Sequence, residues 1–290
     1  MSFEGLQKSE GLFRCPICSG AMKLEQEKSL ICGKGHCFDL SRKGYINFLL
    51  RPVRTEYNKA MLQARNRILT GGIFLPLAQR ICGILERETS SAGQNPIRIL
   101  DAGCGEGTFL AQTADCLRNL VPAGVNGMGM DISKEGIRIA SGKHRDFLWC
   151  VGDLANCPFQ DYRMDVILNL LSPSNYGEFH RILADGGLLI KIVPESDYLK
   201  ELRETLYDRT EKQTYSNEKV LRHFQEHFHL SGQERVRYSV AMDPEKLGDL
   251  IRMTPLSWSA SREKIQGALH SGMDSVTVDM MVLIGKNSGI

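Results

Sequence analysis

The segment of this chain best suited to chemistry is the run from Ile97 to Gly107, which reads IRILDAGCGEG. A short apolar run ends at Asp101, and glycines follow at every second position from Gly103 to Gly107. Glycine is needed where a backbone turns sharply and approaches a ligand closely, so the pattern predicts a strand, a tight turn and a helix start. The spacing G-x-G-x-G differs from the dinucleotide pattern G-x-G-x-x-G. No G-K-[ST] follows, which excludes a P-loop.

Three carboxylates, Asp101, Asp131 and Asp153, fall at or just after the ends of predicted strands. In open parallel sheets, ligands bind at the carboxyl ends of the strands. Asp101 suits an ammonium and Asp131 a pair of ribose hydroxyls. Asp153 and the backbone N–H of Leu154 suit the edge of an adenine. Each acid also has a structural alternative: a turn at 101, a helix N-cap near 131 and an Asx turn at 153.

The glycine turn and these acids together resemble the S-adenosylmethionine site of Rossmann-like methyltransferases. The predicted cofactor contacts are Asp101, Gly103, Gly105, Glu106, Gly107, Thr108, Asp131, Ile132, Asp153, Leu154 and Asn169.

Near the N-terminus, two close pairs of metal-ligating side chains stand 13 residues apart: Cys15-x2-Cys18 and Cys32-x3-His36. Three thiolates and an imidazole suit a tetrahedral zinc ion, and four protein ligands leave no open position for catalysis. We therefore expect a structural zinc site in a small β-rich module. Cys37 is a rival fourth ligand, and unligated buried thiols are the alternative.

The charge of the chain is unevenly distributed. Residues 1–70 carry a net charge of +6 and the remainder −4. A basic front end suits a polyanion, or forms a solvated basic surface. Tyr45 and Phe48 either stack on unpaired bases or, more in keeping with their setting, pack the module against the next domain. The basic candidates for phosphate contact are Arg42, Lys43, Arg51 and Arg54.

Strand and helix patterns then set the architecture. Helical periodicity over 56–69 and 74–87 predicts two bridging helices. Strands are predicted at 97–101, 127–131, 147–151, 164–170, 187–193, 233–240 and 275–284, and helices at 108–117, 134–142, 176–183, 198–208, 218–227 and 245–251. The alternation predicts an α/β fold with a parallel sheet that an antiparallel last hairpin completes to seven strands. The expected domains are a zinc-binding module over 1–52, bridging helices over 53–96 and a catalytic domain over 97–290.

No run of about 18 apolar residues and no secretory signal is present, so we expect a cytoplasmic protein without a membrane partner. Nine cysteines in such a compartment favour metal binding or buried thiols over disulfides.

The phrases FRCPIC, LICGKGHCFDLSRKGYINFLL, DAGCGEGTF and MTPLSW, between Phe13 and Gly285, resemble the RlmA family of bacterial rRNA guanine-N1 methyltransferases. A subgroup of that family confers resistance to tylosin-type macrolides. The resemblance implies Cys15, Cys18, Cys32 and His36 as zinc ligands, further cofactor contacts at Phe74 and Tyr198, and a possible homodimer. The stretch NLLSPSNYGEFHRIL departs from the pattern of the macrolide subgroup, which bears on the choice of guanine.

The expected function is therefore S-adenosylmethionine-dependent methylation of guanine N1 in a hairpin loop of 23S rRNA. N1 lies on the Watson–Crick edge, so the target base must be unpaired or flipped out. Its proton needs an acceptor, for which Asp153 or a water held by Asn169 is a candidate. The alternatives are a methyltransferase for a small molecule or a protein, and a non-catalytic zinc-containing RNA-binding protein.

Overall fold

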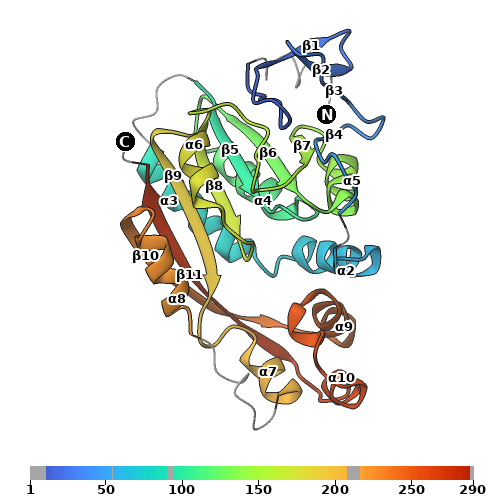
Figure 1. Ribbon diagram of the computed structural model, residues 1–290. Coiled ribbons are helices and arrows are strands. Elements are labelled where there is room, and N and C mark those ends of the chain that lie inside the picture. The colour runs from blue at the N-terminus through green and yellow to red at the C-terminus, as the bar shows by residue number, and fades with distance from the viewer. Residues whose placement is uncertain (1–10, 54, 90–94, 208–215, 288–290) are drawn as a thin grey trace.

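The computed structural model describes residues 11–53, 55–89, 95–207 and 216–287 (Figure 1). Its main sheet has eight strands in the order β10-β11-β9-β8-β5-β6-β7-β4. The strands are β4 (Ile46–Asn47), β5 (Ile97–Ala102), β6 (Val125–Asp131), β7 (Leu148–Val151), β8 (Met164–Leu170), β9 (Leu183–Pro194), β10 (His229–Ala241) and β11 (Ser275–Lys286). Strands β4 to β9 pair in parallel, and β10 and β11 complete the sheet as an antiparallel pair.

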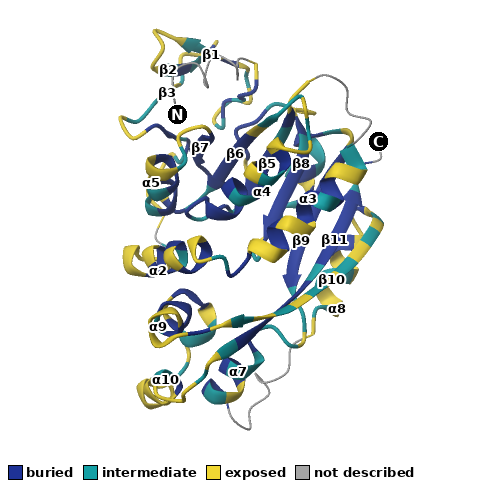
Figure 2. Cartoon of the chain, turned by 180° about the vertical axis from the view of Figure 1, so that it is seen from behind, coloured by how far each residue is buried: buried dark blue, intermediate teal, exposed yellow. Residues whose placement is uncertain are grey.

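Helices cover both faces of this sheet, whose strands are mostly buried (Figure 2). The α-helices of the described residues are α2 (Lys59–Thr70), α3 (Leu75–Thr89), α4 (Thr108–Arg118), α5 (Lys134–Lys143), α6 (Tyr176–Ile182), α7 (Lys200–Leu206), α8 (Glu218–Gln225), α9 (Pro244–Met253) and α10 (Arg262–Leu269), of which α9 and α10 lie away from the sheet. The predicted α/β alternation is confirmed. Helix α10 was not predicted, because its short sequence buries only Ala268 and so carries a weak apolar period.

The predicted count of seven strands is wrong by one. The eighth strand, β4, precedes the predicted domain and pairs in parallel with β7. The N–H of Phe48 extends the pairing by donating to the carbonyl of Val151 at 2.8 Å. Two paired residues are too few to produce a period-two signal, so only tertiary contact defines this strand.

The N-terminal module is a small antiparallel sheet of β1 (Met22–Glu25), β2 (Ser29–Cys32) and β3 (Cys37–Asp39). It packs on the main domain through aromatic side chains. The ring of Phe13 lies 5.5 Å from that of Phe48 and 5.8 Å from that of Phe159. Tyr45 and Phe48 are buried, which confirms packing as their role.

Helix α2 lies between the sheet and the helices α9 and α10 near the other end of the molecule (Figure 1). The guanidinium of Arg67 in α2 donates two hydrogen bonds of 2.6 Å to the carboxylate of Asp249 in α9. This bidentate pair fixes α2 against α9. Within the described ranges, no single helix is long and apolar enough to cross a membrane, and only α2 and α3 taken together, with a bend of 68°, meet that criterion.

Candidate active site and metal centre

The glycine turn between β5 and α4 has the geometry that its sequence predicts. Gly103 and Gly107 have φ angles of +85° and +80°, in the left-handed region that favours glycine. A Cβ atom on Gly103 would lie 1.9 Å from Oγ of Ser172, and one on Gly107 would lie 2.3 Å from the Trp149 ring. Neither position tolerates a side chain, so the turn presents bare backbone at the end of β5.

Asp131 holds this turn in place. Its Oδ2 accepts the N–H of Gly105 at 2.8 Å, and its Oδ1 accepts the N–H of Ser133 at 2.7 Å. Burial raises the pKa of Asp131, and these two backbone N–H groups counter the rise. Ser133, and not Asp131, caps α5 through its side chain. The carboxylate retains further lone pairs that can accept ribose hydroxyls.

Asp101 is a buried acid with no hydrogen-bond donor on its carboxyl among the described residues. Burial raises the pKa of Asp101 to about 8, although the nearby Arg65 guanidinium lowers it. A cation placed beside such a buried carboxyl group stabilises its charged form and lowers its pKa again. This is the property required to receive the ammonium of an amino-acid ligand.

A cavity of about 230 Å³ opens beside the turn. Six of the predicted cofactor residues line it: Gly103, Gly105, Asp131, Ile132, Asp153 and Leu154. We call it the turn cavity. Oδ1 of Asp153 accepts the N–H of Ala155 at 2.9 Å, so the Asx turn is present and does not exclude a binding role. The bare backbone and the acids suit the polar aminoacyl, ribose and adenine groups of S-adenosylmethionine.

Seven predicted cofactor residues do not line this cavity, among them the buried Asp101 and also Tyr198, which lines a second cavity. Gly107 lies behind it, against Trp149, and Phe74 is fully buried in the core. Glu106 is also fully buried and accepts Nε of Arg65 at 3.0 Å. Oγ1 of Thr108 accepts a hydrogen bond from Asn66 at 2.9 Å. Gly107, Phe74, Glu106 and Thr108 are all buried and do not line the cavity.

Asn169 is another of these residues, and both donors and both lone pairs of its side-chain amide are already used. Its Nδ2 donates to the carbonyls of Ala102 and Pro173, and its Oδ1 accepts from Ser174 and Lys191. The amide has no group left with which to hold a water on the substrate side. The structure thus gives Asn169 a positioning role and argues against the predicted part in proton transfer.

A larger cavity of about 580 Å³ adjoins the turn cavity. We call it the outer cavity. The two share Tyr57, Arg65, Leu171 and Ser172 in their walls. Tyr198, predicted from the family resemblance, lines the outer cavity, as do Met253, Thr254, Pro255 and Leu256 of the MTPLSW phrase. Leu171 has a φ of +50°, a strained conformation that is common at functional sites.

Arg65 is a site residue that sequence reasoning missed. It lines both cavities from α2, a helix that was assigned only a bridging role. In the sequence, Arg65 is only one charged residue of a predicted helix. Nothing in the pattern distinguishes it from an arginine on the protein surface. The outer cavity was missed for the same reason, since its walls come from segments far apart in the chain.

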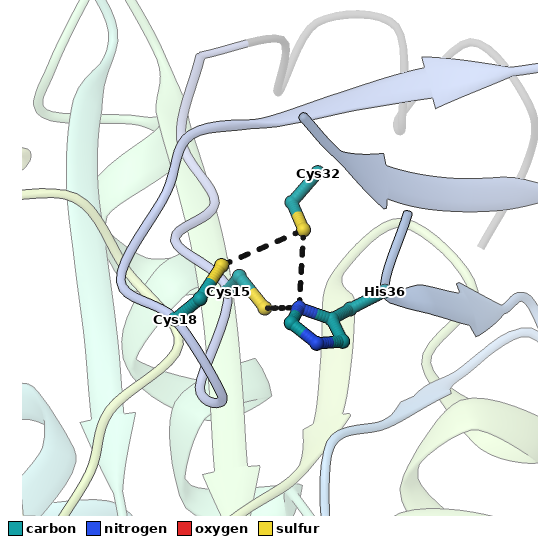
Figure 3. A group of neighbouring side chains, drawn as sticks. All are labelled: Cys15, Cys18, Cys32 and His36. Atoms are coloured by element: carbon teal, nitrogen blue, oxygen red, sulfur yellow. Dashed lines mark hydrogen bonds between the residues drawn. The ribbon is translucent and has the colours of Figure 1, made fainter. Parts of the chain in front are cut away.

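The predicted zinc ligands gather at one point of the N-terminal module (Figure 3). Nδ1 of His36 lies 3.5 Å from Sγ of Cys15 and 3.3 Å from Sγ of Cys32. Sγ of Cys18 lies 3.6 Å from Sγ of Cys32, and all four ligand atoms fall within 4.8 Å of one another. Three thiols and an imidazole at this spacing fit a closed tetrahedral zinc site.

Cys37 takes no part in this cluster. Its side chain is exposed, and its Sγ contacts Oδ1 of Asp39 at 3.5 Å. His36 is therefore the residue whose ring reaches the three thiols.

The predicted phosphate-binding residues are only partly described. Arg42, Lys43 and Arg51 are exposed, whereas Arg54 lies outside the described residues. Lys43 also lines a surface hollow together with Lys59, Arg67, Arg138 and Lys143. Five basic side chains thus surround one depression between the module, α2 and α5.

The strand order, the glycine turn and the acids along the carboxyl edge define an S-adenosylmethionine-dependent methyltransferase, and the four-ligand cluster adds a structural zinc ion. Family models agree: "RlmA, N-terminal", a zinc-ribbon model, matches residues 13–58, and "Methyltransferase domain" matches residues 94–242. The chain belongs to the RlmA family of 23S rRNA guanine-N1 methyltransferases.

Full-length relatives support this assignment. The chain is 42% identical to YxjB of Bacillus subtilis (strain 168), an inferred 23S rRNA (guanine-N(1)-)-methyltransferase, over 94% of this chain and 96% of the relative. It is 30% identical to the 23S rRNA (guanine(748)-N(1))-methyltransferase of Streptomyces fradiae, over 92% of this chain and 94% of the relative. The resemblance expected from the sequence is therefore confirmed.

Proposed function

We propose that this protein methylates N1 of an unpaired guanine in 23S rRNA, with S-adenosylmethionine as the methyl donor. The observation that carries the proposal is the pair of adjoining cavities, which share Arg65, Leu171 and Ser172. One cavity has the acids and bare backbone of a methyl-donor site. The other is large enough for a purine and opens beside it.

The acids in and next to the turn cavity have distinct tasks. Asp101 receives the ammonium, Asp131 accepts the ribose hydroxyls while holding Gly105, and Asp153 with Leu154 meets the adenine edge. When bound, S-adenosylmethionine supplies an electrophilic methyl group, so the protein's main contribution is to orient the acceptor nitrogen.

The outer cavity takes the guanine. N1 is reachable only when the base is unpaired, which favours a hairpin loop as the target. Among the carboxylates of the described residues, Glu195 lines this cavity, whereas Asp153 lines the turn cavity. The carboxylate of Glu195 is therefore the better acceptor for the N1 proton, in place of Asp153 or Asn169.

The N-terminal module holds the RNA backbone. Arg42, Lys43, Arg51 and Arg54 are the proposed phosphate contacts, and zinc bound by Cys15, Cys18, Cys32 and His36 stabilises the module.

The proposed division is a module over 1–52, bridging helices over 53–96 and a catalytic domain over 97–290. A homodimer would set two such modules against one hairpin, and a substrate of this kind places the protein in the cytoplasm.

The proposal is tested by transfer of tritiated methyl groups to an unmodified 23S rRNA transcript, followed by nucleoside analysis. We expect 1-methylguanosine as the product, and none with the Asp131→Asn variant. Transfer only to a protein or small molecule would replace the proposal with the first alternative. Tight RNA binding without any transfer would support the non-catalytic alternative.

A further inference from the structure

Lys191 is a buried cation whose place in the fold the cofactor site does not explain. It lies in β9 opposite Asn169 of β8, near the carboxyl ends of both strands. Its side chain lines the outer cavity, and the residue is only 6% exposed. Burying a lysine ammonium costs free energy unless hydrogen bonds or an opposite charge compensate for the lost solvent.

Two hydrogen bonds fix its ammonium. Nζ donates to Oδ1 of Asn169 at 2.6 Å and to the carbonyl of Ser172 at 2.7 Å. Asn169 is itself held by the carbonyls of Ala102 and Pro173, so its Oδ1 has a fixed direction. The cation is therefore positioned before any substrate arrives, as an effective electrostatic site requires.

An ammonium carries three donors, and only two find acceptors among the described residues. No carboxylate of the described residues offsets the charge of Nζ, and burial lowers the pKa of Lys191 to about 8. The third N–H of Lys191 therefore lacks an acceptor within the described part of the chain, and Lys191 lines the outer cavity. The missing partner is an oxygen acceptor on a ligand of that cavity.

We propose that Lys191 is a specificity-determining residue that donates its third hydrogen bond to O6 of the target guanine. This inference rests on the proposed function. O6 is bonded to the carbon next to N1, so an ammonium at O6 fixes where N1 lies. Adenine carries an amino donor at the same position, which would meet the ammonium donor to donor and be rejected.

The same contact assists the reaction. As the N1 proton leaves for an acceptor such as Glu195, negative charge spreads from N1 to O6. A fixed ammonium beside O6 stabilises that charge. Lys191 would therefore serve both recognition and methyl acceptance, while Asn169 and Ser172 position it.

The test begins by mapping the modified nucleotide in a 23S rRNA transcript with the wild-type protein. Short hairpins are then made with guanine, inosine or 2-aminopurine at that site. Inosine keeps O6 and the N1 hydrogen but lacks the 2-amino group, whereas 2-aminopurine lacks both O6 and the N1 hydrogen. We expect the wild type to bind the guanine and inosine hairpins similarly and the 2-aminopurine hairpin about tenfold more weakly, as for a lost charged hydrogen bond.

Lys191→Met should lower the preference for guanine over 2-aminopurine by about fivefold or more, because only the N1 hydrogen then distinguishes the two bases, and methylation of guanine should fall at least tenfold. Lys286→Met, at the last residue of β11 and outside the lining of the outer cavity, is the control and should keep the preference. Calorimetric S-adenosylmethionine binding reports whether the Lys191→Met variant is folded.

Equal binding of the guanine and 2-aminopurine hairpins by the wild type would overturn the inference even if Lys191→Met does not fold. So would a Lys191→Met variant that keeps the wild-type preference. If the wild-type protein methylates no rRNA at all, the proposed function itself has failed, which is a separate outcome.

Discussion

Arg65 and Glu106 form an ion pair, with Nε 3.0 Å from Oε2, that joins α2 to the glycine turn. Glu106 is fully buried, and the Arg65 side chain is 18% exposed. Burial lowers the pKa of Arg65, but its acidic neighbours, Glu106 first and then Asp131 and Asp101 among others, more than offset this, so the pKa is raised. A helix outside the predicted catalytic domain thus supplies the cation that faces every acid of the turn.

Loss of this pair should destabilise the protein strongly. Arg65→Met leaves the buried Glu106 carboxylate without its partner, which costs about 3 kcal/mol of unfolding free energy. The double variant Arg65→Met with Glu106→Gln should recover a large part of that loss, because no buried charge remains uncompensated. Urea unfolding curves provide the measurement.

The matched control is Arg138→Met, which breaks an i,i+3 pair with Glu135 whose arginine side chain is 46% exposed. It should cost less than about 1 kcal/mol. Equal losses for Arg65→Met and Arg138→Met would contradict a structural role for the buried pair.

The carboxyl group of Asp101 should lower the free energy of unfolding of the ligand-free protein and raise its affinity for the cofactor. Its pKa rises from 3.8 to about 8 on folding, so the folded state keeps a proton that the unfolded state has lost between those values. Stability therefore falls as the pH rises from about 4 to about 8. Asp101→Asn lacks this titration and should melt a few degrees above the wild type at pH 8, with a smaller difference at pH 5.

Thermal melts at both pH values, together with calorimetric S-adenosylmethionine binding, check this prediction. The variant should bind at least about tenfold more weakly, because the ammonium loses a charged acceptor. A variant with normal affinity, or a melting difference that shrinks as the pH rises, would argue against the assigned role of Asp101.

Removal of a zinc ligand should act on the N-terminal module alone. Cys18→Ser takes a thiolate from the cluster, and the module has too small a core to stay folded without the metal. Atomic absorption should show loss of zinc, while the circular dichroism of the main sheet persists. Cys37→Ser is the control, because that exposed thiol lies outside the cluster, and it should retain one zinc per chain. Equal zinc content in the two variants would rule out the assignment.

Charge reversal on the module should change the salt dependence of RNA binding. Arg42→Glu with Lys43→Glu removes two proposed phosphate contacts, which should lower the slope of log affinity against log salt by about 1.4 to 1.8. Binding should fall more at low salt than at high salt. Arg262→Glu with Lys264→Glu, on α10 away from the module, serves as control and should leave the slope unchanged (Figure 1). The same slope in all three proteins would disprove an RNA-facing module.

The parts of the site that the sequence alone determined depend on spacing along the chain. Cys15 and Cys18 lie in one turn, and Cys32 and His36 lie at the end of β2 and in the turn after it, so the short spacing already brings the ligands of each pair together. The positions of the glycine turn and Asp131 follow from the predicted strand ends, because parallel strands bring their carboxyl ends to one edge of the sheet. Such features need only local geometry and the α/β alternation, and both can be read from residue types.

The tertiary structure decided which distant segments meet at that edge. Arg65 from α2 pairs with Glu106 across 41 positions, and Lys191 depends on Asn169 and Ser172 from the neighbouring strand and its loop. The strand at Ile46–Asn47 exists only because it lies beside β7. These contacts arise from packing between elements that leave no periodic signal in either partner, which is why the second cavity and its cations became visible only in the folded chain.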